Sequence, residues 1–107
     1  MESIKNNHEF RRAYRKGKAL IHRELVVYVF RNRRSKTCRY GITTSNKIGH
    51  AVTRNRARRV IRAAWQKIEP EIRPGYDFVF VARGRTARVK STEIYRLLQE
   101  LLAPYCK

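Results

Sequence analysis

The sequence predicts an α+β domain whose elements follow one another in the order αβββαβα. Three observations predict it. The chain has 107 residues, enough for one domain with a modest core. Its hydrophobic residues, 42% of the chain, come in short blocks with either helical or strand-like spacing. Turn residues separate these blocks, without an internal repeat or a linker-like tract, so we expect residues 1–107 to form a single domain.

The first element expected is a short helix near the N-terminus. Asn6 or Asn7 can cap its start, and Gly17 can end it. Phe10 and Tyr14 are four residues apart within it, a spacing that places both rings on one face of a helix.

Three strands should follow, at residues 18–21, 24–32 and 39–45. In the second strand two apolar sets alternate with the two-residue period of a β-strand: Leu25, Val27 and Val29 with Val26, Tyr28 and Phe30. Residues 31–36 are rich in Arg and Lys, and we expect a basic hairpin loop there.

The second half predicts a helix, a strand and a final helix. Residues 46–50 form a Gly-containing connection into a helix at 53–69, and Pro70 marks its exit. An apolar strand is expected at 76–83. The last helix, at 91–102, has leucine and isoleucine at helical spacing: Ile94, Leu97, Leu98, Leu101 and Leu102.

The most informative segment is the start of the second helix, which has five arginines in nine residues. Its polar residues are Arg54, Asn55, Arg56, Arg58, Arg59 and Arg62. At about 100° per residue, Asn55, Arg58, Arg59 and Arg62 fall on one side. The opposite side holds Ala57, Val60, Ile61, Ala64 and Ile68, and Trp65 beside this stripe should complete the core. One face is therefore suited to packing and the other to a polyanion.

The charge of the whole chain supports nucleic acid as the partner. The chain has 26 Lys and Arg against 8 Asp and Glu, a net charge of +18 that repels itself until a polyanion neutralises it. Arginine can hold phosphate oxygens with two parallel hydrogen bonds and can stack on bases. A helix face of arginines is usually solvated, but like charges this dense destabilise an isolated helix, and a bound polyanion would relieve that repulsion.

Other features exclude several classes of protein. Apolar runs are far shorter than the roughly 20 residues of a membrane span, and the first residues lack the apolar stretch of a secretory signal, so we expect a cytoplasmic protein without a membrane partner. Cys38 and Cys106 are isolated, and we interpret both as structural or incidental.

The sequence offers no candidate catalytic or metal-binding residue. Its carboxylates are scattered singly, whereas a metal-dependent nuclease needs several that converge. His8, His22 and His50 lack a paired ligand or nucleophile at suitable spacing, and each is more consistent with a surface or RNA-contacting residue. We therefore expect no catalysis by the protein alone.

One stretch has a more specific meaning. Residues 45–62 read SNKIGHAVTRNRARRVIR, with an Arg-Asn-Arg core, and this resembles the signature of the bacterial ribonuclease P protein subunit. The resemblance extends over nearly the whole chain, to the first helix and the last strand, through Glu9, Phe10, Tyr14 and Gly17 and through Tyr76, Val79, Val81, Ala82 and Arg83.

This resemblance implies a fold and a function. The fold would be an αβββαβα domain with a mixed sheet and a left-handed βαβ crossover, against the usual right-handed rule. The protein would assist a catalytic RNA that removes the 5′ leader of precursor tRNA by hydrolysis. The partners would be that RNA and precursor tRNA, with no obligate protein partner. Magnesium ions would act in the holoenzyme, held mainly by RNA and not tightly by the protein alone.

The resemblance also implies two RNA-contacting surfaces. The first would bind the catalytic RNA through Lys47, Arg54, Asn55, Arg56, Arg58, Arg59 and Arg62. The second would be a cleft for the leader of precursor tRNA, lined by Phe10, Tyr14, Tyr28, Arg39, Thr43 and Ser45. Aromatic faces stack on bases with little sequence preference, which suits a leader of variable sequence. Asn46 departs from the family, which usually has lysine there.

Alternatives remain open on residues alone. Isolated aromatics at this spacing, such as Phe10, Tyr14 and Tyr28, are equally consistent with core or half-buried sheet positions. A structural RNA binder of the ribosomal-protein type would share the charge without preferring a tRNA precursor over mature tRNA. A stand-alone ribonuclease would cleave without added RNA, and the scattered carboxylates disfavour it.

Overall fold

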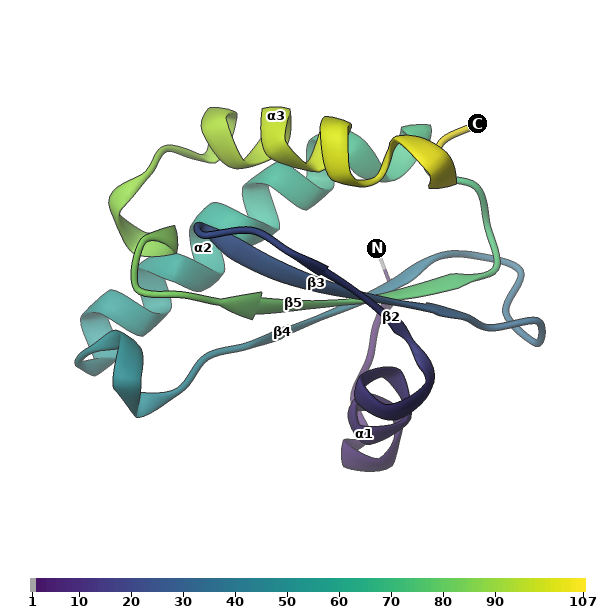
Figure 1. Ribbon diagram of the computed structural model, residues 1–107, viewed down its shortest axis with the longest axis horizontal. Helices are drawn as coiled ribbons and strands as arrows, with labels where there is room; N and C mark the ends of the chain where they lie inside the picture. The colour runs from purple at the N-terminus through teal and green to yellow at the C-terminus, as the bar shows by residue number, and fades with distance from the viewer. Residues whose placement is uncertain (1) are drawn as a thin grey trace.

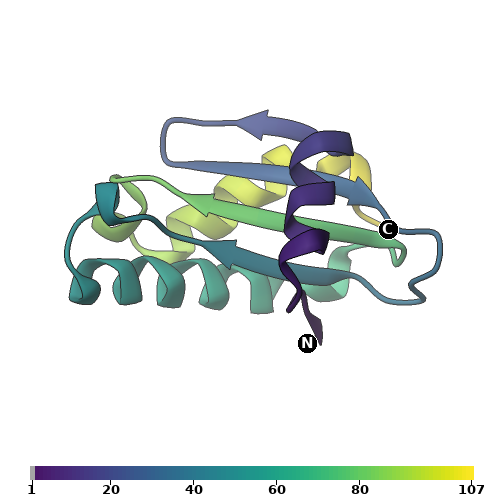
Figure 2. The same ribbon diagram turned by 90° about the horizontal axis from the view of Figure 1, so that it is seen from below.

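A computed structural model describes residues 2–107 and confirms the α+β class (Figure 1). Its helices and strands are β1 (Glu2–Ser3), α1 (Asn7–Lys16), β2 (Lys18–Ile21), β3 (Leu25–Arg31), β4 (Arg39–Thr43), α2 (Ala51–Ile68), β5 (Tyr76–Ala82) and α3 (Ser91–Leu101). Short 3-10 turns are η1 (Asn46–Ile48), η2 (Glu69–Glu71), η3 (Thr86–Arg88) and η4 (Ala103–Tyr105). The strands form one five-stranded sheet in the order β1-β4-β5-β3-β2. Helices α2 and α3 cover one face, and α1 lies on the other (Figures 1 and 2).

All seven predicted elements are present, with small differences at their ends. Helix α2 begins at Ala51, two residues before the predicted start, and Asn6 occupies the N-cap position of α1 without a side-chain capping bond. Strand β1 was not predicted, because two residues are too few to show a period. It pairs in parallel with β4, with Glu2 opposite Arg39.

The predicted hairpin between β3 and β4 is wrong, because β5 lies between them. Strand β5 is antiparallel to β3 and parallel to β4. It takes the central position because it is apolar on both faces, with Phe78, Val79 and Phe80 completely buried. The basic segment after β3 instead bridges over the start of β5, where the Asn32 amide donates to the carbonyl of Gly75 at 2.7 Å.

The connection from β4 through α2 to β5 is a left-handed crossover. Figure 2 views the sheet from the α1 side, with the arrows of β4 and β5 both pointing left, β5 above β4 and α2 on the far side. When the view of Figure 2 is turned so that these strands point upward, β5 lies to the right of β4 and α2 lies behind the sheet. A connection that moves to the right behind the sheet is left-handed. This exception to the usual right-handed connection agrees with the expected fold.

The core between the sheet and the two long helices is built around Trp65. This fully buried side chain lies 5.8 Å from the ring centroid of Tyr40, 5.3 Å from Phe78 and 5.6 Å from Phe80. The predicted apolar stripe of α2 is buried with it, and so is Leu98 of α3. Burial of these residues stabilises the layer that carries the arginine face of α2.

Candidate nucleic-acid interface

The arginine segment of α2 divides as predicted into a packed side and a solvent side. Ala57, Val60, Ile61, Ala64 and Ile68 are buried against the sheet and α3. On the other side Asn55, Arg56, Arg59 and Arg62 are exposed, whereas Arg54 and Arg58 are half-buried. The packed side of α2 thus fixes the helix on the sheet and α3, and the other side presents a row of cations.

Arg54 forms hydrogen bonds to the turn that precedes α2. Its Nη1 donates to Oδ1 of Asn46 at 2.6 Å and to the carbonyl oxygen of Gly49 at 3.2 Å. Asn46 is the position at which the resembled family usually has lysine, and here its side chain accepts a hydrogen bond from an arginine. Lys47, also in this turn, is exposed.

The start of α2 favours an anion. Its first turn contains no acidic residue, and His50 at the N-cap makes no side-chain capping bond. Uncapped amides and the helix dipole leave partial positive charge at this end, where phosphate groups bind well. A hollow of 510 Å³ lies beside it, with Lys47, Thr53 and Arg56 in its lining. Two predicted RNA-contacting cations, Lys47 and Arg56, therefore meet at one concave site.

On the opposite face of the sheet, three of the predicted cleft residues meet. The rings of Tyr14 and Tyr28 have centroids 4.9 Å apart and lie edge to face at 78°. The Tyr14 hydroxyl is 3.3 Å from Oγ1 of Thr43, to which it donates a hydrogen bond. Tyr14 remains 38% exposed, so its ring is accessible at the edge of α1.

Phe10 has a clearer packing role than its neighbours. Its ring lies directly over Gly41 of β4, where an added Cβ would come within 2.6 Å of Cε1 of Phe10. The glycine therefore permits the close approach of α1 to the sheet. Phe10 is half-buried and packs with Ile4, Ala13 and Val79 beneath α1.

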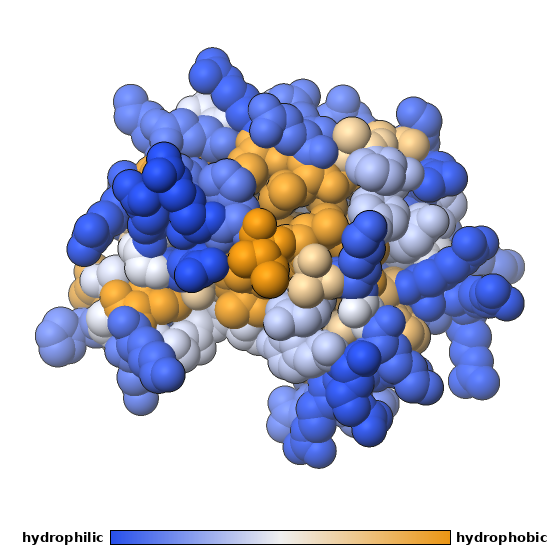
Figure 3. Space-filling model, viewed as in Figure 1, coloured by the Kyte–Doolittle hydropathy of each residue, from blue (hydrophilic) through white to orange (hydrophobic). Residues whose placement is uncertain are grey.

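Beyond α1 the sheet face is open. Figure 2 shows α1 crossing only one end of the strands. One row of cross-strand partners past this helix runs from Thr43 through Val81 and Val26 to Ile21. Thr43, Val81 and Val26 are half-buried, and Ile21 is 71% exposed. Figure 3 looks onto the β2 edge, with the α3 side of the sheet above and the α1 side below, and shows apolar residues gathered along this edge and toward α3, surrounded by hydrophilic side chains. Ser45 is exposed past the end of β4.

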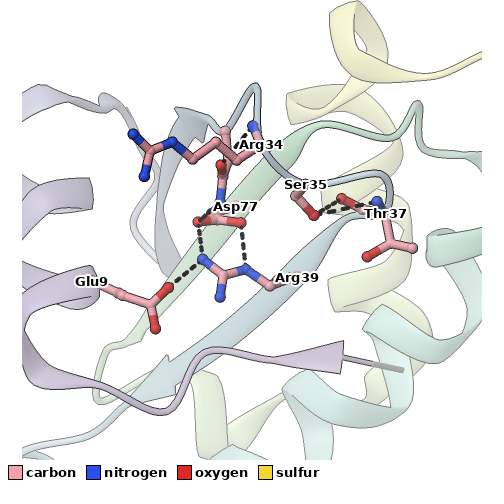
Figure 4. Close-up of polar contacts among 7 residues, drawn as sticks. Glu9, Arg34, Ser35, Thr37, Arg39 and Asp77 are labelled. Atoms are coloured by element: carbon pink, nitrogen blue, oxygen red, sulfur yellow. Dashed lines mark hydrogen bonds and ion pairs between the residues drawn. The ribbon is translucent and has the colours of Figure 1, made fainter.

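Arg39 lies at the other end of the sheet face, within an ionic network (Figure 4). Its Nε and Nη2 donate to the two carboxylate oxygens of Asp77 at 3.0 and 2.7 Å. The same Nη2 is 2.5 Å from Oε2 of Glu9, and Nδ2 of Asn32 donates to Asp77 at 3.2 Å. The network joins α1, β4, β5 and the segment after β3.

Glu9 and Asp77 stand singly in the sequence, and the fold brings them together at Arg39, a contact that the sequence did not predict. They converge on one guanidinium because α1 and β5 both border β4 at this point. The available signal was Asp77, an acidic residue within an otherwise apolar strand, where a buried charge requires a partner.

The network shifts the protonation equilibria of its members. Burial alone would raise the pKa of Glu9, but the hydrogen bond from Arg39 and the charges of Arg39, His8 and Arg12 outweigh it and lower that pKa. Hydrogen bonds and charge from Asp77 and Glu9 raise the pKa of Arg39. Arg39 is consequently held as a cation by two anions.

The described part of the chain contains no cluster of three His, Cys, Asp or Glu side chains able to hold a metal ion. Glu9 and Asp77 share their charge with Arg39, which competes with a cation for their oxygens. Within residues 2–107, no helix has the length and apolar character needed to cross a bilayer.

A small α+β domain with a cationic helix face and a partly open aromatic sheet face defines a class of protein suited to polyanions. The comparisons give the family. The model of the ribonuclease P family matches residues 1–106, so the chain belongs to the ribonuclease P protein family, the protein component of a tRNA-processing endoribonuclease.

Relatives and solved structures agree with this assignment. The chain is 38% identical to the ribonuclease P protein component of Oceanobacillus iheyensis, over 92% of this chain and 82% of that one, and 37% identical to that of Clostridioides difficile, over 94% and 89%. The RNase P protein of Staphylococcus aureus superposes with a TM-score of 0.84 at 32% identity, covering 97% and 94% of the two chains. That of Thermotoga maritima gives 0.79 at 26% identity, covering 94% and 96%.

Proposed function

We propose that this protein binds the catalytic RNA of ribonuclease P and the 5′ leader of precursor tRNA, and so aids magnesium-dependent removal of the leader. The observation that carries the proposal is the exposed arginine row on α2, built on a fully packed layer in a chain of net charge +18. Family membership supports the partnership with ribonuclease P RNA.

The two sides of the sheet suit two different RNA segments. The α2 side offers charge and forked donors with few aromatic groups, which suits the phosphate backbone of a structured RNA. On the α1 side, Tyr14 and Tyr28 border an open apolar floor, which suits unstacked bases of a single strand. We assign the first side to the catalytic RNA and the second to the leader.

Within this division, two predicted cleft residues have supporting roles. Phe10 is occupied by its contact with Gly41, and Arg39 by its bonds to Asp77 and Glu9. Both residues fix α1 on the sheet, and so position Tyr14 next to Tyr28 and Thr43. Hydrolysis is assigned to the RNA, where magnesium would be held by phosphate oxygens. The protein would raise the affinity for substrate.

Cleavage of a 5′-extended precursor tRNA at low magnesium concentration tests the proposal. The samples are the protein alone, a bacterial ribonuclease P RNA alone, and both together. Activity chiefly in the combined sample supports the proposed subunit. Equal activity with and without the protein contradicts it, and cleavage by the protein alone identifies a nuclease.

A binding comparison separates the proposal from a structural RNA binder of the ribosomal type. The assembled protein and catalytic RNA should bind precursor tRNA more tightly than mature tRNA, and the preference should grow as the leader is lengthened. A structural binder would leave the two tRNA affinities equal.

A further inference from the structure

The segment that joins β5 to α3 is a second basic element. Residues 83–90 read RGRTARVK and contain four cations with no acidic residue. Arg83 is engaged with the sheet side, since its Nη1 donates to the carbonyl oxygen of His22 at 3.2 Å. Arg85, Arg88 and Lys90 are exposed. None of these cations belongs to the predicted contact surfaces.

This segment is held in a fixed conformation. Thr86 is completely buried, and its Oγ1 donates to the carbonyl oxygen of Glu24 at 2.6 Å while it accepts the Arg83 amide at 2.9 Å. From the other side, Nε of Arg56 donates to the carbonyl oxygen of Ala87 at 2.7 Å. The three surface cations are therefore presented by a rigid loop that is tied directly to the arginine helix.

Two hollows lie along the seam between this loop and α2. The hollow of 510 Å³ at the start of α2 is lined by Lys47 and Arg56 on one side and by Gly84 and Arg88 on the other. A second hollow, of 390 Å³, is lined by Arg56 and Arg59 of α2 and by Lys90, Ser91 and Thr92 of the other wall. Arg56 borders both hollows and separates them where its Nε bonds to Ala87, so cations line both walls of the seam on either side of this residue.

The chemistry of the seam fits a sugar-phosphate backbone. With its Nε bonded to Ala87, Arg56 can turn its Nη1 and Nη2 donors toward an external acceptor. Arg88 and Lys90 face it across the two hollows and can bind successive phosphates. At the first hollow Val52 is 78% exposed, and its methyl groups offer an apolar contact for a ribose or a base.

We propose that the loop 83–90 is a second RNA-binding element, and that a strand of the partner RNA lies in the seam with successive phosphates in its two hollows. This inference rests on the proposed function and extends the contact surface from α2 to the start of α3. The dense cations on both walls favour nucleic acid over an acidic peptide, whose side chains carry fewer and less regularly spaced charges.

Gly84 allows a direct test. No atom lies within 4 Å of a Cβ built there, and its φ is not in the left-handed region, so a side chain fits without displacing the loop. Gly84→Glu and Gly84→Gln are nearly equal in size and differ in charge. In filter binding with ribonuclease P RNA at fixed salt, the glutamate variant should bind about tenfold more weakly than the glutamine variant. Equal affinities of the two variants would overturn the proposal.

A second pair tests the cations themselves. Arg88→Ala removes one charge from the seam, and Arg96→Ala removes the same charge from the exposed face of α3. The slope of log affinity against log salt should fall by about 0.7 to 0.9 for Arg88→Ala, the value of one phosphate contact, and should change much less for Arg96→Ala. Equal slopes for the two variants would show that only net charge matters.

The unmodified protein is the reference that separates the two proposals. If it fails to bind ribonuclease P RNA, the proposed function is wrong, and the seam proposal falls with it. If it binds and the Gly84 pair or the arginine pair shows no difference, only the seam proposal is wrong. A competition experiment compares polyglutamate with single-stranded RNA of equal total charge. If both displace the bound RNA from wild type equally well, the seam accepts an acidic peptide, and the seam proposal is overturned.

Discussion

The two faces of the sheet differ in how their surfaces are made. On the α2 and α3 side the sheet is sealed, with Trp65 fully buried among rings, and the exposed arginines project from the outer side of α2. On the α1 side the covering helix is short, and part of the sheet itself, from Thr43 to Ile21, forms the surface. On the α2 and α3 side, the packed core supports a charged helix surface. On the α1 side, apolar side chains of the sheet remain accessible.

The largest effect should come from the sealed side. Trp65→Ala should lower the free energy of unfolding by about 3 to 5 kcal/mol, because it leaves a large cavity between α2 and the sheet. Urea denaturation followed by far-UV circular dichroism measures the change. Tyr28→Ala on the open side is the matched control and should cost clearly less, because its half-buried site is already partly hydrated. Equal losses would mean that the two faces contribute equally to stability.

The next effect concerns the link between the two sides. Asp77→Asn should destabilise the fold by about 3 kcal/mol, since it removes one anion from the guanidinium of Arg39, which is mostly buried. Glu9→Gln should cost less, because Glu9 makes one contact to Arg39 and Asp77 makes two. The same urea titration measures both variants, and the reverse order would refute the central place of Asp77.

How far the sequence predicts this molecule depends on the kind of contact. Local patterns suffice for α2, whose buried and exposed residues follow the helical period. They fail for the partner of β3, because the central place of β5 is decided by burial of Phe78, Val79 and Phe80 across the whole sheet.

Contacts distant in sequence are the harder part of the candidate site. Glu9, Arg39 and Asp77 are joined by bonds between residues far apart in the sequence. Arg39 and Asp77 are separated by 38 positions, and no periodic pattern predicts such a contact. The contact of Arg56 with the carbonyl of Ala87 is of the same kind. The sequence therefore predicts which face is basic, whereas the structure is needed to find what each arginine already holds.

A pair of variants should separate the two proposed RNA-contacting surfaces. Replacing both Arg54 and Arg56 with alanine should weaken binding of the catalytic RNA by about 2 kcal/mol, since charge-assisted hydrogen bonds are lost. Tyr14→Ala should instead reduce the preference for precursor over mature tRNA by about 1 kcal/mol, the lower end of base stacking on an aromatic side chain. Affinities for the catalytic RNA and for both tRNA forms measure the two effects. If both variants change the same affinity, the division into two surfaces is wrong.

The smallest effect should be a pH dependence on the α1 side. The pKa of Glu9 is lower in the folded protein than in the unfolded chain, so its ion pair with Arg39 stabilises the fold above the unfolded pKa of about 4.3. This contribution is lost as the pH falls through the lower folded pKa. Wild type should therefore exceed Glu9→Gln in stability at pH 6, by no more than about 1 kcal/mol, and the difference should shrink toward pH 3. Trp65→Phe, on the sealed side, should differ from wild type by the same amount at both pH values. If the stability difference between wild type and Glu9→Gln does not change with pH, the carboxylate acts through packing. The contrast between the two faces would then not be electrostatic at this position.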